Sequence, residues 1–507
     1  MMYAPYFAVP LLALIVLTAL FRSHRLIELI AILCVFPVAS VLDLTFGEGL
    51  YSVPPCLLAA LLLLPCAMAQ SHSWGSGQRI ESIVRMYLPL LGFTVFAVLT
   101  SVLLPVLFAG MFQTAQSMDT FGIASLAWGR MNITQSIYLV VLGSFAFLVS
   151  CELTGHRDAI RGVVNAFILC GYLAALIAAY QLASDRFGWP FPLRTLYSRP
   201  EARSLESTVR QYQVGGNIIR QVFGSFSEPS TLAQFMLGSL FGSGYWWVRG
   251  GAPWRVKGLA VASLAILLVT VSSTAYVGLA VAAIFLVAYL LMCGRLSAAL
   301  VALIFFAALG LILARVIGEQ DLGAFQTLAN NVLDLVWFAK RDSFSFQVRW
   351  LVDSVALDGF LDTYGLGLGW GSTRGSSLLI HLLGNTGVIG IVFLTWFAWN
   401  IRRRMRAGVP PVLGFIVAAL CGNLLGGAIA VPDITSVTLW LLIGLAVAAS
   451  LTSAKTTEGP QCLLIPRQNS ESALPNVVPR PLLDPDLDLA TLAAASSQDT
   501  LMIDKTL

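Results

Sequence analysis

The sequence predicts an all-α polytopic membrane protein with about 13 transmembrane helices and two large extracytoplasmic loops. The 507 residues are 57% hydrophobic and only 11% charged, which excludes a soluble domain of ordinary composition. The apolar residues are also gathered into long runs, and a bilayer core needs about 20 apolar residues per helix. The runs lie near 4–21, 26–44, 51–69, 86–110, 133–151, 162–183, 229–248, 258–274, 276–293, 298–317, 378–399, 410–430 and 434–451.

Two of these runs need a further argument. The block 258–293 counts as two helices only if the chain turns tightly at Ser272-Ser273-Thr274. The first run, from Tyr6 to Phe21, lacks a basic region before it and a small-residue cleavage site after it. We therefore expect a retained helix there and not a signal peptide.

Short-loop charge gives the orientation, because Lys and Arg collect in cytoplasmic loops. With the amino terminus outside, the short loops that carry arginine, such as Arg402-Arg403-Arg404, all fall inside. The short opposite loops 45–50 and 431–433 carry only Glu48 and Asp433. The net charge of +4 is too small to argue for a nucleic-acid partner.

The chain then divides into six parts. The last is predicted to be a disordered cytoplasmic tail, because no apolar face of useful length survives there. In order, the parts are helices 1–6 (1–183), a first extracytoplasmic loop (184–228), helices 7–10 (229–317), a second extracytoplasmic loop (318–377), helices 11–13 (378–452) and the tail (453–507).

The eight cysteines have no CxxC or other metal-ligand spacing. Seven fall in or at the ends of apolar runs, so they are interpreted as small buried apolar residues and not as a disulfide framework or a zinc site.

Two stretches carry the chemistry that the sequence suggests. In the first, around Arg220, Gly224 and Ser225 allow close backbone approach, and Glu228-Pro229 opens a helix. The second, Gly365 to Ser377, again combines glycines, hydroxyls and one arginine before an apolar span. We expect the two stretches to fold into one site for a phosphate-bearing ligand. Solvated loop charge balanced by nearby carboxylates is the alternative for most loop arginines.

These stretches resemble the O-antigen polymerase and ligase superfamily (Wzy- and WaaL-like), membrane glycosyltransferases that use polyprenyl-diphosphate-linked sugars. The resemblance covers roughly residues 130 to 450. It rests on Arg220-Gln-Val-Phe-Gly-Ser-Phe-Ser-Glu228-Pro229, on the hydroxyl-rich span 267–281 and on Gly365-Leu-Gly367-Leu-Gly369-Trp-Gly371-Ser372-Thr-Arg374. Ligase-type members carry a histidine just after the glycine-rich stretch. That slot falls near Ser376-Ser377 and not at His381, which favours the polymerase branch.

The resemblance implies transfer from a lipid diphosphate, with negative charge growing on the leaving group. Guanidinium groups of Arg220, Arg349 and Arg374 are expected to stabilise that charge. They would replace a divalent ion, so we expect an inverting, metal-independent enzyme without a cofactor. The expected substrate-binding residues are Gly224, Ser225, Gly367, Gly369, Gly371, Ser372, Arg210 and Arg341.

Two residues compete for the role of general base toward the acceptor hydroxyl. Glu228 lies eight residues after Arg220 at a helix start; the alternative is a carboxylate that only complements the helix dipole. His381 forms an i, i+4 polar pair with Asn385 on one helix face; the alternative is a histidine packed between helices.

The expected function is polymerisation of lipid-linked repeat units into an exopolysaccharide or O-antigen. The alternatives are a ligase that moves the glycan to an acceptor and a precursor transporter or flippase. The expected partners are a lipid-linked oligosaccharide donor and acceptor, the bilayer, a chain-length regulator and a flippase. The expected location is the bacterial inner membrane, with the active site on its extracytoplasmic face.

Overall fold

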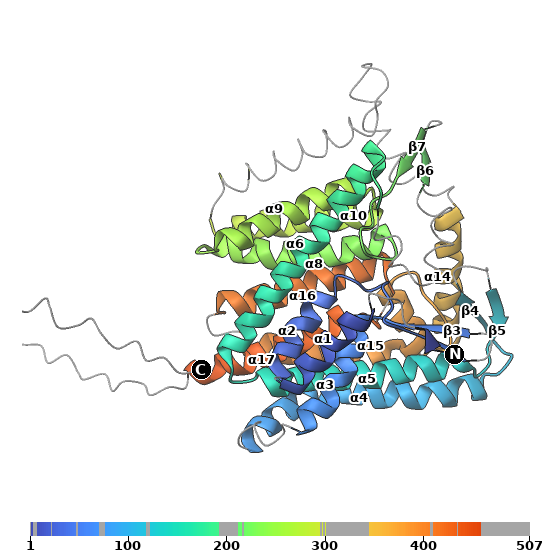
Figure 1. Ribbon diagram of the computed structural model, residues 1–507. Helices are drawn as coiled ribbons and strands as arrows, with labels where there is room; N and C mark the ends of the chain where they lie inside the picture. Colours follow the sequence, from blue (N-terminus) through green and yellow to red (C-terminus); the bar gives the residue numbers. More distant parts are fainter. Residues whose placement is uncertain are drawn as a thin grey trace, which may run out of the picture. The chain divides into compact units, whose positions relative to one another are not determined.

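The computed structural model describes residues 2–3, 8–21, 23–46, 49–69, 77–117, 122–191, 211–214, 217–294, 297, 300, 344–405, 409–432 and 434–457 (Figure 1). Most of these residues are helical. Outside the described residues lie the expected span 298–317 apart from Leu300, as well as Arg210, Arg341 and most of the expected tail. The helices are α1 (Ala8–Phe21), α2 (Ser23–Leu33), α3 (Pro55–Ala69), α4 (Gly77–Leu107), α5 (Arg130–Leu153), α6 (Arg157–Phe187), α8 (Pro229–Arg249), α9 (Trp254–Val269), α10 (Ser273–Met292), α14 (Phe344–Asp362), α15 (Leu378–Arg404), α16 (Pro411–Ala430) and α17 (Val437–Thr457).

Within the described ranges, six helices are long and apolar enough to cross a membrane, namely α4, α5, α6, α10, α15 and α16. Shorter apolar stretches lie in α1, α3 and α17. The protein is therefore a multi-pass helical membrane protein. Residues 258–293 form two helices as predicted, because α9 ends at Val269 and Ser272 is the N-cap of α10.

The structure is mostly helical, as predicted, and also contains three small antiparallel sheets. The first has the order β1 (Met2–Tyr3), β2 (Leu42–Phe46), β3 (Gly49–Val53). The others are two hairpins, β4 (Gln113–Ser117) with β5 (Gly122–Ser125), and β6 (Gln211–Val214) with β7 (Asn217–Arg220). These strands are too short to stand out in a scan for apolar runs of membrane length.

Two predicted boundaries also change. The second predicted loop contains helix α14, which the scan missed because its charged residues interrupt the apolar pattern. Its buried Val348, Val352 and Val355 follow helical spacing and pack on Ala115 of β4. The tail was predicted to begin at 453, but α17 continues to Thr457.

Helices α8 and α16 pack against each other (Figure 1). Small residues line both sides of the contact. A Cβ added to Gly238 or Gly242 of α8 would press on backbone oxygens of α16. Gly422 of α16 meets the backbone of Leu237 in the same way. Such glycines let two helix backbones approach closely where the membrane provides no hydrophobic driving force.

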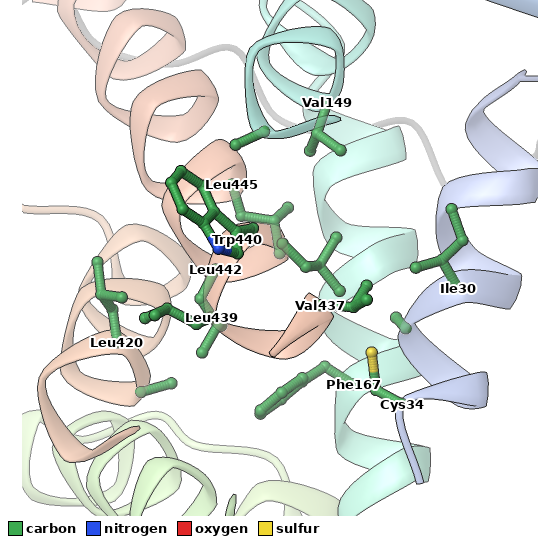
Figure 2. Packing of buried hydrophobic residues seen from close by; sticks show 14 of the residues in the cluster. Ile30, Cys34, Val149, Phe167, Leu420, Val437, Leu439, Trp440, Leu442 and Leu445 are labelled. Carbon is green, nitrogen blue, oxygen red and sulfur yellow. The ribbon is translucent and has the colours of Figure 1, made fainter. Parts of the chain in front are cut away.

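The hydrophobic core surrounds α17, as Figure 2 shows. Trp440 is 2% exposed, and its indole nitrogen donates to the carbonyl of Ile434 at 2.6 Å. Side chains from other helices join the cluster, including Phe167 of α6 and Val149 of α5 (Figure 2). This packing fixes residues 434–438, several of which line the cavity described next.

Candidate functional site

A cavity of about 430 Å³, called the main cavity below, lies between segments far apart in the sequence. Its lining comes from the residues that follow α2, from the start of α3, from α5, and from the start of α8 with the residues before it. The rest comes from α14, from the loop before α15, from α16 with the residues that follow it, and from the start of α17. Its polar lining residues include Gln135, Tyr138, Glu228, Thr231, Gln234, Arg349, Arg374, Asn423 and Thr438. The structure thus brings three of the five expected catalytic residues, Glu228, Arg349 and Arg374, to one cavity.

A side cavity of about 30 Å³ lies next to the main cavity. The two share Gln135, Arg374 and Pro432 in their linings. His381 lines the side cavity only, together with Gly371 and Ser372. The side cavity has room for about one or two water molecules. Arg374 therefore stands where the two spaces meet.

Arg349 and Glu228 form a loose ion pair at the main cavity. Arg349 Nη2 lies 3.6 Å from Glu228 Oε2, and the two side chains remain 25% and 33% exposed. Ser230 also donates its hydroxyl hydrogen to Glu228 Oε2 at 2.9 Å. A pair this exposed contributes only about 0.2–1 kcal/mol, so Arg349 is available to a stronger anion.

Glu228 occupies the N-cap of α8, directly before Pro229 at the first helical position. Its backbone nitrogen donates to the hydroxyl of Thr231 at 3.2 Å. This agrees with the helix start predicted from Glu228-Pro229. The carboxylate itself lies at the cavity, next to the positive end of the helix dipole.

Arg374 is exposed, but its backbone is fixed. Its nitrogen donates to the carbonyl of Ala115 in β4 at 2.8 Å, and the nitrogen of Ala115 donates to Thr373 Oγ1 at 3.3 Å. Within the ranges that the structure describes, no carboxylate pairs with this guanidinium. The edge of β4 thus anchors a cation whose side chain stays accessible in the cavities.

Three side chains missed by sequence reasoning, or noted only in passing, hold the loop that carries Arg374. Asn385, which is completely buried, accepts from the nitrogens of Ser372 and Thr373 at 3.1 and 3.3 Å. It also donates to the carbonyls of Thr373 and His381 at 2.8 and 2.7 Å. All of its hydrogen-bonding capacity is thereby used inside the protein.

Asn132 of α5 holds the same loop from the other side. Its amide nitrogen donates to the carbonyl of Trp370 at 2.8 Å and to the hydroxyl of Ser372 at 2.9 Å. No sequence signal marks Asn132, which is more than 200 residues from its partners. Ser372 is therefore held by two asparagines at the edge of the side cavity.

Asp353 of α14 is the third anchor. It accepts from the nitrogen and the hydroxyl of Ser376 at 2.6 and 2.5 Å. Burial raises the pKa of this carboxyl, while the Ser376 hydrogen bonds and the charge of Arg349 act in the opposite direction.

His381 and Asn385 do lie on one face of α15, as predicted. The amide nitrogen of Asn385 is 3.3 Å from His381 Nδ1, and the imidazole packs edge-on against Trp370 at 5.7 Å between ring centroids. His381 is only 6% exposed. Its ring is thus held among protein groups at the wall of the side cavity.

The glycines of the second stretch allow the loop to pack against helices. Gly367 and Gly369 have φ of +80° and +96°, and a Cβ at either position would collide with backbone of α15 or α4. Neither lines the two cavities, in contrast to the ligand cradle expected from the sequence. Gly371 does line the side cavity, although a Cβ there would also press on Met131.

In the first stretch, too, some of the expected substrate-binding residues make packing contacts and do not line a cavity. The nitrogen of Gly224 donates to Gln181 of α6 at 2.8 Å, and Ser225 donates its hydroxyl hydrogen to the carbonyl of Val35. Both are buried and absent from the cavity linings, so their contacts join α6 and the end of α2 to the start of α8. The backbone of Arg220 ends strand β7, and its side chain lies outside what the structure describes.

Comparison of the chain with protein-family models and with curated proteins found no match. Within the described ranges, no three His, Cys, Asp or Glu side chains are grouped so that they could hold a metal ion. The fold and the cavities define a multi-pass helical membrane protein with a polar, arginine-lined cavity.

Proposed function

We propose that the protein is a membrane glycosyltransferase that polymerises polyprenyl-diphosphate-linked oligosaccharide repeat units. The single observation that carries the proposal is the main cavity, which Arg349 and Arg374 line together with Glu228. The two arginines come from a segment predicted to be extracytoplasmic, and Glu228 comes from the other predicted extracytoplasmic segment. Two cations and one carboxylate at a cavity in a membrane protein suit the handling of a lipid-linked diphosphate.

In the proposed reaction, an acceptor hydroxyl oxygen attacks the anomeric carbon of the donor sugar. The bond from that carbon to the phosphate oxygen breaks, and the diphosphate leaves with the bonding electron pair. Arg349 and Arg374 stabilise the growing negative charge, which is greater in the transition state than in the ground state. A single displacement of this kind inverts the configuration at the anomeric carbon.

The proton of the acceptor goes to Glu228 in this proposal. Its carboxylate lines the main cavity and is held by Ser230 and Arg349. When the diphosphate takes Arg349, the ion pair opens, which leaves the carboxylate available to accept the proton.

The ligase reaction is the second candidate, and the placement of His381 favours it. His381 lines the side cavity, which shares Arg374 with the main cavity. A histidine at that position could accept the proton of an acceptor hydroxyl in the main cavity through a water molecule in the side cavity. The two candidates differ in acceptor and not in the role of the arginines.

The test is analysis of lipid-linked glycans in cells that lack the protein. A polymerase predicts accumulation of single repeat units on lipid, and a ligase predicts long lipid-linked chains. Inside-facing precursors would instead identify a transporter and overturn the proposal. Purified protein should transfer sugar in the presence of a chelator; activity lost in chelator and restored only by metal would refute the expected metal independence.

A further inference from the structure

Two cysteines that the proposed reaction does not use lie on the wall of the main cavity. Cys34 directly follows α2, and Cys56 is the second residue of α3. Both are free thiols, 2% and 4% exposed, and both line the main cavity. The 22-residue separation in sequence gave no sign of this proximity.

The two thiols contact each other. The side chains of Cys34 and Cys56 are hydrogen-bonding partners, and the hydroxyl of Thr438 is a second partner of Cys34. Helices α2 and α3 also pack together, so the contact belongs to a wider interface. Two thiols in contact on a cavity wall meet the first requirement for a disulfide, namely that the two sulfur atoms lie close together.

Two other cysteines are the possible competitors. Cys66 is ten residues beyond Cys56 on α3, which is about 15 Å along a helix axis. Cys170 of α6 lies within electrostatic range of Cys34, but it does not line the main cavity. Among the cysteines that the structure describes, only Cys34 and Cys56 therefore combine mutual contact with access from the cavity.

We propose that Cys34 and Cys56 form an oxidisable dithiol site that closes to a disulfide when a small disulfide compound enters the main cavity. One cysteine thiolate attacks a sulfur of the compound, which forms a mixed disulfide and releases one equivalent of the small thiol. The second cysteine then attacks the first cysteine's sulfur and displaces the other small thiol. The protein loses two protons and two electrons, and the compound gains them.

Closure would link the end of α2 covalently to the start of α3. It would also remove the thiol of Cys34 from its contact with Thr438, which is the second residue of α17. The redox conditions around the protein would thus determine whether the wall of the main cavity carries this covalent link. The inference does not rest on the proposed glycosyl transfer.

The experiment treats the full-length protein in lipid nanodiscs with 2-hydroxyethyl disulfide, a small uncharged probe. Free thiols are then alkylated, and the protein is digested with chymotrypsin without reduction. Tyr51 provides a cleavage position between the two cysteines, so a bond between them joins two separate peptides. The expected result is a linked Cys34–Cys56 peptide pair that separates on reduction, with Cys66 recovered in alkylated form.

Controls make the result decisive. Exposed Cys293 should form a mixed disulfide with the probe in the same sample, which shows that the probe is reactive. Cys56→Ser should abolish the linked pair, whereas Cys66→Ser and Cys170→Ser should retain it. Recovery of Cys34 and Cys56 as alkylated thiols while Cys293 is modified, or linkage of Cys34 to Cys66 or Cys170, overturns the proposal.

Discussion

The carboxylate of Asp353 accepts hydrogen bonds from both the nitrogen and the hydroxyl of Ser376, at 2.6 and 2.5 Å. This contact joins α14 to the loop two residues after Arg374. Arg349 lies one turn before Asp353 on the same helix, so one helix supplies a cavity arginine and fixes the loop that supplies the other. The following predictions test this arrangement and the groups around it.

Asp353→Ala should lower the free energy of unfolding by about 1–3 kcal/mol, because it leaves the nitrogen of Ser376 without its acceptor. Asp353→Asn should cost less, since one side-chain oxygen can still accept. Thermal unfolding of the full-length protein in nanodiscs measures the effect. Asp358→Ala, an exposed position on the same helix, is the matched control. Equal unfolding temperatures for the two alanine variants would show that the contact contributes nothing.

The same carboxyl gives a prediction of pH dependence. Burial raises its pKa in the folded protein above the ordinary value of 3.8. A raised pKa means that the folded state favours the protonated form, so the stabilisation is complete below 3.8 and is lost as pH rises through the folded pKa. The unfolding temperature of the wild type minus that of Asp353→Asn should therefore fall as pH rises from about 3.8. If this temperature difference rises with pH over the same range, the predicted direction of the pKa shift of Asp353 is wrong.

Asn385→Ala should be among the most destabilising single changes in α15. It removes the partner of four backbone groups of Ser372, Thr373 and His381 in a fully buried position, and each unsatisfied group costs about 1–3 kcal/mol before relaxation. Thr386→Val is the control, because this neighbouring buried residue gives one intrahelical hydrogen bond to Leu382. If both variants unfold at the same temperature, the asparagine does not hold the loop.

Gly369→Ala should destabilise the protein by about 1–3 kcal/mol, because the backbone is in the left-handed region and the added Cβ meets the carbonyl of Thr100. Gly244→Ala in α8 is the opposite case, since a Cβ there meets no atom within 4 Å. Helix propensity favours alanine over glycine, so this control should retain or raise stability. Unfolding curves of the two variants, measured side by side, provide the test. Destabilisation by Gly244→Ala but not by Gly369→Ala would contradict the prediction.

Arg349→Gln and Arg374→Gln should each reduce the rate of glycosyl transfer by about 10²- to 10³-fold if they stabilise the leaving diphosphate. Arg249→Gln is the control, because this arginine ends α8, stacks on Tyr245 and lines neither cavity. Rates with a purified lipid-linked donor and acceptor provide the measurement. Wild-type rates for both cavity variants, with normal unfolding temperatures, would remove the arginines from the proposed mechanism.

The sequence alone determined the features that depend on neighbouring residues. Long apolar runs indicated most of the described helices, Glu228-Pro229 marked the start of α8, and Ser272-Ser273-Thr274 marked the break between α9 and α10. These features depend on hydrophobic length and on capping within a few residues, so they are readable without a partner. The i, i+4 pair of His381 and Asn385 was readable for the same reason.

Only the tertiary structure decided which of these segments meet. Asn132 reaches Trp370 across 238 residues, and the backbone of β4 fixes Arg374 although the two stretches share no local signal. The same holds for the glycines, whose spacing suggested a ligand cradle but whose missing side chains make room for backbone of other helices. Close packing depends on the surface of the partner helix, which the sequence of one segment does not encode by itself.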